Sequence, residues 1–376
     1  MNNSKIWLSS PHMGGNEQQY VQEAFDTNWV APLGPNVSGF ETDLESFLND
    51  DVYVAALSSG TAAIHLGLIL LGVQAGDEVI CQSFTFSASA NPILYLGATP
   101  VFIDSETDTW NMSPIALEQA ITDRISKGKK PKAIIPVHLY GMPFKVDEIK
   151  AIAEKYGIPI LEDSAEALGS TYKGKKCGTF GDVGVLSFNG NKIITTSSKN
   201  VKEKAVFLAT QARDNAPHYQ HSEIGYNYRL SNICAGIGRG QMEVLEKHVK
   251  LRREMRDFYA HFFKNIDGIT VSREPNADYH SNFWLTCIVI DSKKLGKTSQ
   301  DLRLALEAEN IESRPLWKPM HLQPIFEKYP YYGGNVSENL FENGLCLPSG
   351  SNLNEDDKER ISNALYQFLS NTFVQK

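Results

Sequence analysis

Short apolar runs that alternate with helical stretches constrain the fold of this chain more than any other feature. Five such runs lie in its first half: Glu78–Cys81, Thr99–Ile103, Lys132–Val137, Ile158–Leu161 and Val183–Phe188. Helical patterns lie between them, among them residues 114–126 and 146–156. Apolar strands separated by helices indicate a mostly parallel sheet that is covered on both faces. We therefore expect an α/β protein with three layers, in which ligands bind at the carboxyl ends of the strands.

Composition excludes several classes of function. The 36 basic and 44 acidic side chains give a formal net charge of −8, which argues against a broad nucleic-acid-binding surface. The five cysteines are scattered and form no CxxC pair, so the sequence predicts neither a disulfide framework nor a metal site. No signal-peptide pattern and no apolar run long enough for a bilayer is visible, so the expected location is the cytoplasm, without membrane contact.

A chain of 376 residues is long enough for two domains. Residues 1–245 carry the alternating pattern and are expected to form the large domain, whose N-terminal segment can pack on the small one. Residues 246–376 are expected to form a smaller C-terminal α+β domain. It opens on a long helical stretch, Glu246 to Ile266, whose apolar stripe is typical of packing.

Polar and aromatic side chains gather just after the expected strands. In chain order, these loops hold Gly60 and Thr61, Phe86, His138, Asp163 and Glu166, and Ser187 with Lys192. Each has a plain structural interpretation. They can be helix N-caps, core aromatics, a hydrogen-bonded core histidine and, for Lys192, a solvated loop lysine.

Together, these residue types match the needs of pyridoxal phosphate. A partly desolvated lysine can bond the cofactor aldehyde and then move a proton. A carboxylate beside the pyridine nitrogen keeps it protonated, and a flat side chain fixes the plane of the ring. Hydroxyl groups and the N–H groups of a helix start hold the phosphate. The sequence therefore predicts a pyridoxal phosphate site at this edge of the sheet.

Four motifs in this order resemble those of the DegT/DnrJ/EryC1/StrS family of pyridoxal-phosphate sugar aminotransferases. They are Ser59-Gly60-Thr61-Ala62-Ala63, Glu162-Asp163 with Glu166, Ser187 through Lys192, and Gly225 through Ser231. The resemblance covers nearly the whole chain. It implies the fold of the aspartate aminotransferase superfamily, fold type I, with a large cofactor-binding domain and a smaller C-terminal domain.

The resemblance also implies roles for single residues. Lys192 would be the Schiff-base lysine and Asp163 the partner of the pyridinium nitrogen, which makes these two the catalytic residues. The other implied cofactor contacts are Phe86 on the ring, Gly60, Thr61 and Ser187 on the phosphate, Glu166 near the 3-hydroxyl, and Asn227 on the phosphate of the neighbouring subunit. An active site shared in this way makes a homodimer obligatory.

The substrate contacts are expected in three loops, one of which is the His138 loop after Lys132–Val137. Residues 314–321 gather cations, an aromatic ring and a histidine between prolines. This is either a surface loop or, by the resemblance, a loop that faces a nucleotide-linked substrate. Trp29 lies in a breaker-rich loop that is either a connection or the wall of a pocket. The expected substrate-binding residues are Trp29, His138, Arg314, Trp317, Lys318 and His321.

The resemblance implies an aminotransferase that moves an amino group from an amino acid to a nucleotide-linked keto-sugar. The amino donor that the resemblance implies is glutamate. The sequences of the Trp29 loop and of the loop at residues 314–321 are most similar to those of members that aminate C4 of 4-keto-6-deoxy hexoses, such as UDP-4-keto-6-deoxy-N-acetylglucosamine. A lysine at 192 disfavours relatives that carry histidine there and remove a sugar hydroxyl. The alternative is a non-catalytic regulatory member that binds cofactor or sugar. A nicotinamide-dependent Rossmann enzyme is disfavoured, since Gly236–Gly240 lacks the GxGxxG spacing and a preceding strand.

One segment departs from the family pattern. Family members follow the lysine with a glycine-rich turn and a further short strand, whereas here Thr195–Asn200 passes almost directly into the next helix. Either a strand is missing from the sheet, or this sequence omits a segment that the native chain has. The difference lies beside Lys192, so it bears on how this lysine is held.

Overall fold

The computed structural model describes residues 4–48, 52–187, 195–197 and 199–370. Its central element is a mostly parallel sheet with the spatial order β14–β3–β2–β4–β5–β8–β9–β1, in which two parallel bridges, Ile134 to Ile160 and Val137 to Asp163, join β4 to β5. The strands are β1 (Tyr53–Ala55), β2 (Glu78–Gln82), β3 (Thr99–Ile103), β4 (Ala133–Ile135), β5 (Leu161–Ser164), β8 (Val183–Leu186), β9 (Thr195–Ser197) and β14 (Tyr331–Tyr332). The expected α/β fold is confirmed.

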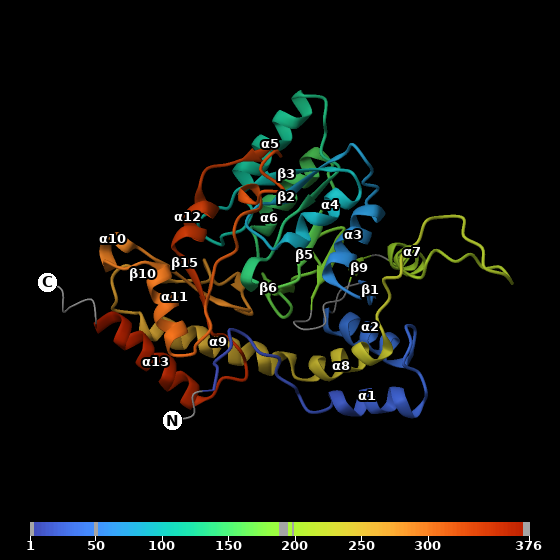
Figure 1. Ribbon diagram of the computed structural model, residues 1–376. Coiled ribbons are helices and arrows are strands. Elements are labelled where there is room, and N and C mark those ends of the chain that lie inside the picture. Colours follow the sequence, from blue (N-terminus) through green and yellow to red (C-terminus); the bar gives the residue numbers. More distant parts are fainter. Residues whose placement is uncertain (1–3, 49–51, 188–194, 198, 371–376) are drawn as a thin grey trace.

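Helices cover both faces of this sheet (Figure 1). One core lies under α3 (Gly60–Leu70), α4 (Asn91–Tyr95) and α7 (Lys199–Ala209), with α2 (Pro35–Leu48) and α8 (Asn232–Glu243) packed beyond. The other lies under α5 (Pro114–Ser126) and α6 (Val146–Tyr156). Helix α1 (Glu17–Asp26) packs on α8. Because both faces are buried, the parallel strands are apolar along their length rather than alternating.

The predicted strand Ile158–Leu161 was placed too early. The observed β5 begins at Leu161 and runs through two acidic residues, Glu162 and Asp163. Glu162 is fully buried, and its carboxylate accepts hydrogen bonds from the backbone N–H groups of Gly178, Phe180 and Gly181. A buried carboxylate that receives several donors is compensated for lost hydration. Charged residues can therefore lie inside a buried strand, whereas an apolar pattern alone predicts that the strand ends where they begin.

A strand is present where the sequence left its existence open. Residues Thr195–Ser197 form β9, which lies between β1 and β8 and is antiparallel to both. Thr196 pairs with Val54 on one side and with Gly184 on the other. The sheet is thus continuous across this position, and β9 is built from the residues that directly follow the lysine segment.

The C-terminal part contains a separate antiparallel sheet with the order β10–β12–β15–β13. Its strands are β10 (Ile269–Val271), β12 (Thr286–Ile290), β13 (Arg314–Pro315) and β15 (Gly344–Leu347). Its helices are α9 (Leu245–Phe262), α10 (Ser292–Leu295), α11 (Ser299–Ala308), α12 (Val336–Asn343) and α13 (Glu355–Ser370). The expected division near residue 245 stays a prediction, and it coincides with the break between α8 and α9.

Two contacts connect the ends of the chain to other parts of the molecule. Ile6 pairs with Ile311, so the N-terminal segment packs on the C-terminal sheet. Strand β14 leaves that part of the chain and pairs with β3 at the edge of the main sheet.

A third, small sheet joins β6 (Thr171–Tyr172), β7 (Lys175–Lys176) and β11 (Tyr279–His280). None of the helices in the described ranges is both long and apolar enough to cross a membrane.

Candidate active site

The start of α3 and the end of β8 form a place for an anion. Ser59 caps α3, its side chain accepting from the Ala62 N–H at 3.1 Å, and the first residue of the helix is Gly60. A Cβ atom added at Gly60 would meet nothing within 4 Å, so open space faces the helix start. Ser187 is buried, and its Oγ has no hydrogen-bond partner among the described residues. Free helix N–H groups beside an unpaired buried hydroxyl suit a phosphate.

Asp163 is held by a short chain of hydroxyl groups. The Asp163 side chain is nearly buried, and its Oδ2 accepts from Ser89 Oγ at 2.6 Å. Ser89 in turn contacts Thr85 Oγ1 at 2.8 Å, while Asp163 Oδ1 accepts from the Ala165 N–H at 3.1 Å. Burial, and secondarily the Asp163 charge, raise the pKa of the Cys81 thiol, so Cys81 is an inert neighbour. Sequence reasoning missed Ser89, although two hydroxyls four residues apart after β2 were a usable signal.

Aromatic rings extend outward from Phe86. The Phe86 ring is 43% exposed and lies 5.4 Å from the ring of Trp317, centroid to centroid. Trp317 is stacked on Tyr140 at 6.3 Å, and Tyr140 on Trp284 at 6.4 Å. The exposed apolar surface of this ring suits contact with a planar ligand.

Glu166 lies between this aromatic row and Asp163. Its Oε2 accepts from the Tyr140 backbone N–H at 2.6 Å, and its Oε1 lies 3.4 Å from Trp317 Nε1. Asn282 donates to the Glu166 and Leu168 carbonyl oxygens at 3.0 and 2.9 Å, which fixes the segment after β5. Two elements distant in sequence therefore position the Glu166 carboxylate.

Comparison with known proteins decides the family. The model of the DegT/DnrJ/EryC1/StrS aminotransferase family matches residues 11–366. The chain belongs to this family. It is 52% identical to EpsN of Bacillus subtilis, named as a pyridoxal phosphate-dependent aminotransferase, over 99% of this chain and 98% of that one. It is 36% identical to the GDP-perosamine synthase of Escherichia coli over 97% of this chain and 99% of the relative.

Solved structures agree with this assignment. A DegT DnrJ EryC1 StrS aminotransferase from Brucella abortus superposes with a TM-score of 0.86 at 30% identity, covering 94% of this chain and 95% of its own. The alignment with EpsN spans 384 positions, more than this chain has residues, so EpsN contains residues that are absent here. The chain is thus an aminotransferase of this family, and its cofactor is pyridoxal phosphate, as the sequence predicted.

The described residues fit this cofactor. The unpaired Ser187 hydroxyl and the open start of α3 suit its phosphate, the buried Asp163 carboxylate suits its ring nitrogen, and Phe86 offers a flat face. Thr61 follows Gly60 and is half-buried. Lys192 lies outside the described residues, in the segment between β8 and β9. Its role therefore stays a prediction from the family motif.

His138 does not line the cavity that Trp317 borders. Its side chain is fully buried, and its Nε2 lies 2.7 Å from Glu162 Oε1. Its Nδ1 accepts from the Phe144 backbone N–H at 3.1 Å, which makes Nε2 the protonated, donating nitrogen. His138 also lies near Cys177 and Glu162 in an arrangement that resembles a metal site, but the histidine nitrogens are already engaged. Two residues further on, Tyr140 reaches the site instead.

The expected substrate residues divide between two places. Arg314, Trp317 and Lys318 line one open cavity of about 960 Å³, together with Trp7 and Trp284. His321 does not line it, because its Nδ1 is 2.7 Å from Ser83 Oγ and its ring is stacked on Tyr331. These contacts anchor the loop.

Trp29 and Asn227 lie elsewhere. Asn232, at the start of α8, donates to the Trp29 carbonyl oxygen at 2.8 Å, and Trp29 does not line the Trp317 cavity. Asn227 is exposed, and its backbone pairs with that of Thr210. Within one chain, neither residue joins the aromatic row.

Proposed function

We propose that this enzyme moves the amino group of an amino acid, glutamate, to C4 of a nucleotide-linked 4-keto-6-deoxy hexose such as UDP-4-keto-6-deoxy-N-acetylglucosamine. The observation that carries the proposal is the 960 Å³ cavity, which adjoins Phe86 through Trp317. Its lining holds two cations, Lys318 and Arg314, of which Arg314 is paired with Glu312 at 2.6 Å. Cations suit a diphosphate, and tryptophan rings suit a base and a sugar face. A cytoplasmic location is part of the same proposal.

Each residue has a task in this function. When bound, pyridoxal phosphate supplies the carbonyl group that accepts the amine and the ring that takes up negative charge. Lys192 would hold the cofactor and move a proton at its amine nitrogen, as in the family motif. Asp163, fixed by Ser89, would keep the ring nitrogen protonated. The aromatic row would exclude water from one side of the site.

The test is an amination assay with glutamate and a panel of nucleotide-linked keto-sugars. The unaltered chain should be yellow and should aminate a 4-keto-6-deoxy substrate, whereas Lys192→Ala should lose at least about a thousandfold in rate, since covalent catalysis is removed. Lys199→Ala, which removes an exposed lysine at the start of α7, is the matched control and should keep full rate. Activity that survives Lys192→Ala would refute the central assignment.

A second function is favoured by one observation: residues 195–200 follow the lysine segment without the glycine-rich turn of the family pattern. A family member with a changed lysine segment could bind cofactor or sugar without turnover and act as a regulator. Borohydride treatment separates the two functions, because it traps the cofactor only on a lysine that bonds it. Colourless protein that takes up no added pyridoxal phosphate would support neither enzyme nor cofactor-dependent regulator.

The family resemblance also leads us to propose a homodimer with shared active sites. Asn227 is exposed and outside its own chain's site, as a residue that contacts a neighbour must be. The loop that carries it, between α7 and α8, projects from the molecule beyond α7 (Figure 1). Asn227→Ala should therefore weaken cofactor binding while leaving the fold unchanged.

A further inference from the structure

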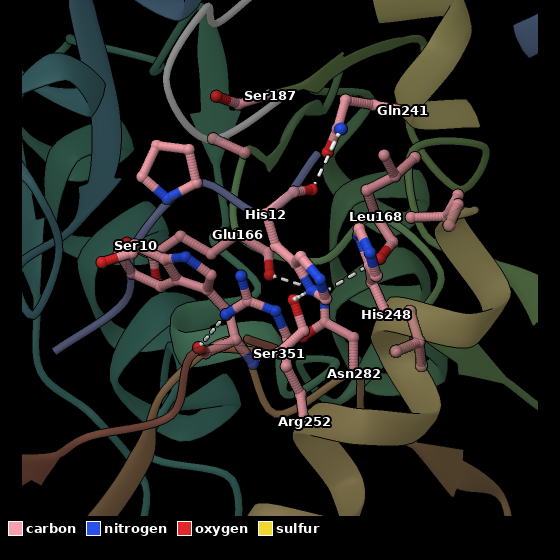
Figure 2. A pocket seen from close by; sticks show the side chains of 15 residues that line it. Ser10, His12, Glu166, Leu168, Ser187, Gln241, His248, Arg252, Asn282 and Ser351 are labelled. Atoms are coloured by element: carbon pink, nitrogen blue, oxygen red, sulfur yellow. Dashed lines mark hydrogen bonds between the residues drawn. The ribbon is translucent and has the colours of Figure 1, made fainter. Parts of the chain in front are cut away.

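A second and smaller cavity, of about 120 Å³, adjoins the cofactor residues (Figure 2). Ser187 and Glu166 line one side of it, and His12, His248 and Arg252 line the other. Ser10, Pro11 and Trp284 border both this cavity and the 960 Å³ cavity. The two cavities thus lie on either side of one shared wall, and the smaller one is far too small for a nucleotide-linked sugar.

The cation of the smaller cavity is Arg252. Its Nη1 donates to the Trp284 carbonyl oxygen at 2.7 Å and lies 3.3 Å from Ser9 Oγ. No carboxylate of the described residues lies within ion-pair distance of it, whereas Arg253 on the same helix pairs with Glu274 at 2.6 Å. Figure 2 shows the Arg252 side chain extending from α9 into the cavity. Its Nε and Nη2 groups therefore remain available as donors for a ligand.

The surroundings of Arg252 favour an anion. Burial lowers the pKa of Arg252 to about 10, so the guanidinium remains charged at neutral pH although it is poorly hydrated. The rings of His12 and His248 are stacked at 4.5 Å, and His12 Nδ1 lies 3.2 Å from Ser351 Oγ. Burial, and then the neighbours His12 and Arg252, lower the pKa of His248 to about 4, so this ring is neutral.

Glu166 is the acidic residue of the lining, and both of its carboxylate oxygens accept hydrogen bonds from elsewhere. Its two carboxylate oxygens accept from the Tyr140 N–H and face Trp317 Nε1, on the side of the aromatic row. No ion pair between Glu166 and Arg252 exists at 4.0 Å or less in the described structure. Burying a guanidinium that has no ion-pair partner costs free energy, and a bound anionic ligand would offset that cost.

We propose that this cavity is the subsite for a carboxylate of the amino donor, with Arg252 as the residue that binds it. The inference rests on the proposed function and gives the two substrates of that reaction two separate places. The keto-sugar takes the large aromatic cavity, and the small acid takes the cationic one. The small cavity is lined by Glu166 and Ser187, and Trp317 of the large cavity contacts Glu166 and Phe86, so both places border the cofactor site.

Glutarate is the probe that tests the subsite. This dicarboxylate has the carbon chain of glutamate but no amine, so it binds without reacting. Calorimetry on the full chain should give measurable binding of glutarate and about tenfold or more weaker binding of the uncharged glutaramide. Arg252→Met should weaken glutarate binding about tenfold or more. Lys250→Met, which removes an exposed charge from the same helix, should leave it unchanged.

Two outcomes would overturn the subsite: equal glutarate affinity in Arg252→Met and the unaltered chain, or no measurable binding to the unaltered chain. If Arg252→Met fails to fold, Arg252→Lys keeps the charge but loses the fork of donors, and it must still weaken binding about threefold or more. Cofactor uptake is followed separately by visible absorbance. A chain that binds glutarate through Arg252 but takes up no pyridoxal phosphate would refute the proposed function alone.

Discussion

His248 couples the stability of the protein to pH. Its pKa is lowered to about 4 in the folded chain, against an ordinary value near 6.5, with burial as the largest cause. Below pH 6.5 the unfolded chain binds a proton that the folded chain refuses until about pH 4. The unfolded state then binds more protons, so the free energy of unfolding falls as the pH drops through this window.

Replacing His248 by Gln should remove this contribution. Between pH 7 and pH 5, the variant should lose less stability than the unaltered chain, by on the order of 1 kcal/mol, since the ring is only partly buried. Urea unfolding at the two pH values measures the difference. His218→Gln, at an exposed histidine, should keep the slope of the unaltered chain. Equal slopes in the His248 variant and the unaltered chain would contradict the shift.

At the scale of single residues, the sequence predicted which residue types form the site better than it predicted where each side chain points. Phe86 and Ser187 follow strand ends, Asp163 lies within the last residues of β5, and all three suit the cofactor, because strand order alone brings such positions to one edge. His138 follows a strand in the same way, yet it turns inward to Glu162, whereas Tyr140 is the residue of this loop that lines the large cavity. Arg252 lies in a helix whose apolar stripe indicated packing only. Which side chain faces a cavity depends on tertiary contacts that no local pattern contains.

At the scale of elements, a change in the first turn of α3 should affect cofactor binding without lowering stability. A Cβ added at Gly60 would meet nothing within 4 Å, and Gly60 does not require a positive φ. Gly60→Ala should therefore keep or slightly raise stability, by up to about 1 kcal/mol. The added methyl group would stand where a phosphate approaches the helix start, so affinity for pyridoxal phosphate should fall about tenfold or more.

Gly67→Ala in the same helix is the matched control. Its Cβ would lie 2.7 Å from Leu161 Cδ1 and 3.2 Å from Val183 Cγ1, between helix and sheet. Overpacking at such a place costs about 1–3 kcal/mol. Thermal unfolding and a cofactor titration followed by absorbance should thus show opposite patterns for the two glycines. A Gly60→Ala chain that binds the cofactor normally would remove α3 from the phosphate site.

The elements that the sequence predicted well are those with local signals. Strand β3 and helices α5 and α6 have the predicted bounds, because apolar periodicity and flanking turn residues define them. Strands β9 and β14 have little such signal. Each is short and exists because a partner strand is available, β8 and β1 for the former and β3 for the latter. Pairing over long sequence distance cannot be read from a window of neighbouring residues.

At the scale of the whole molecule, the proposed dimer predicts that no chain completes its own site. The loop between α7 and α8 exposes Tyr219 and Ile224, 79% and 83% accessible, beside the exposed Asn227. Apolar side chains this exposed on a projecting loop suit a contact with another chain. A twofold dimer would place this loop of each chain against the site of the other.

Mixed dimers test this arrangement directly. Chains with Lys192→Ala and chains with Asn227→Asp, co-expressed with different tags, give dimers that carry one change in each subunit. If the site is shared, one of the two sites collects both changes and the other has neither, so about half of the native activity should return. If Asn227 serves its own chain, both sites of the mixed dimer are defective and no activity returns. Dimers of the unaltered chain with Lys192→Ala should show about half activity under either arrangement, which calibrates the assay.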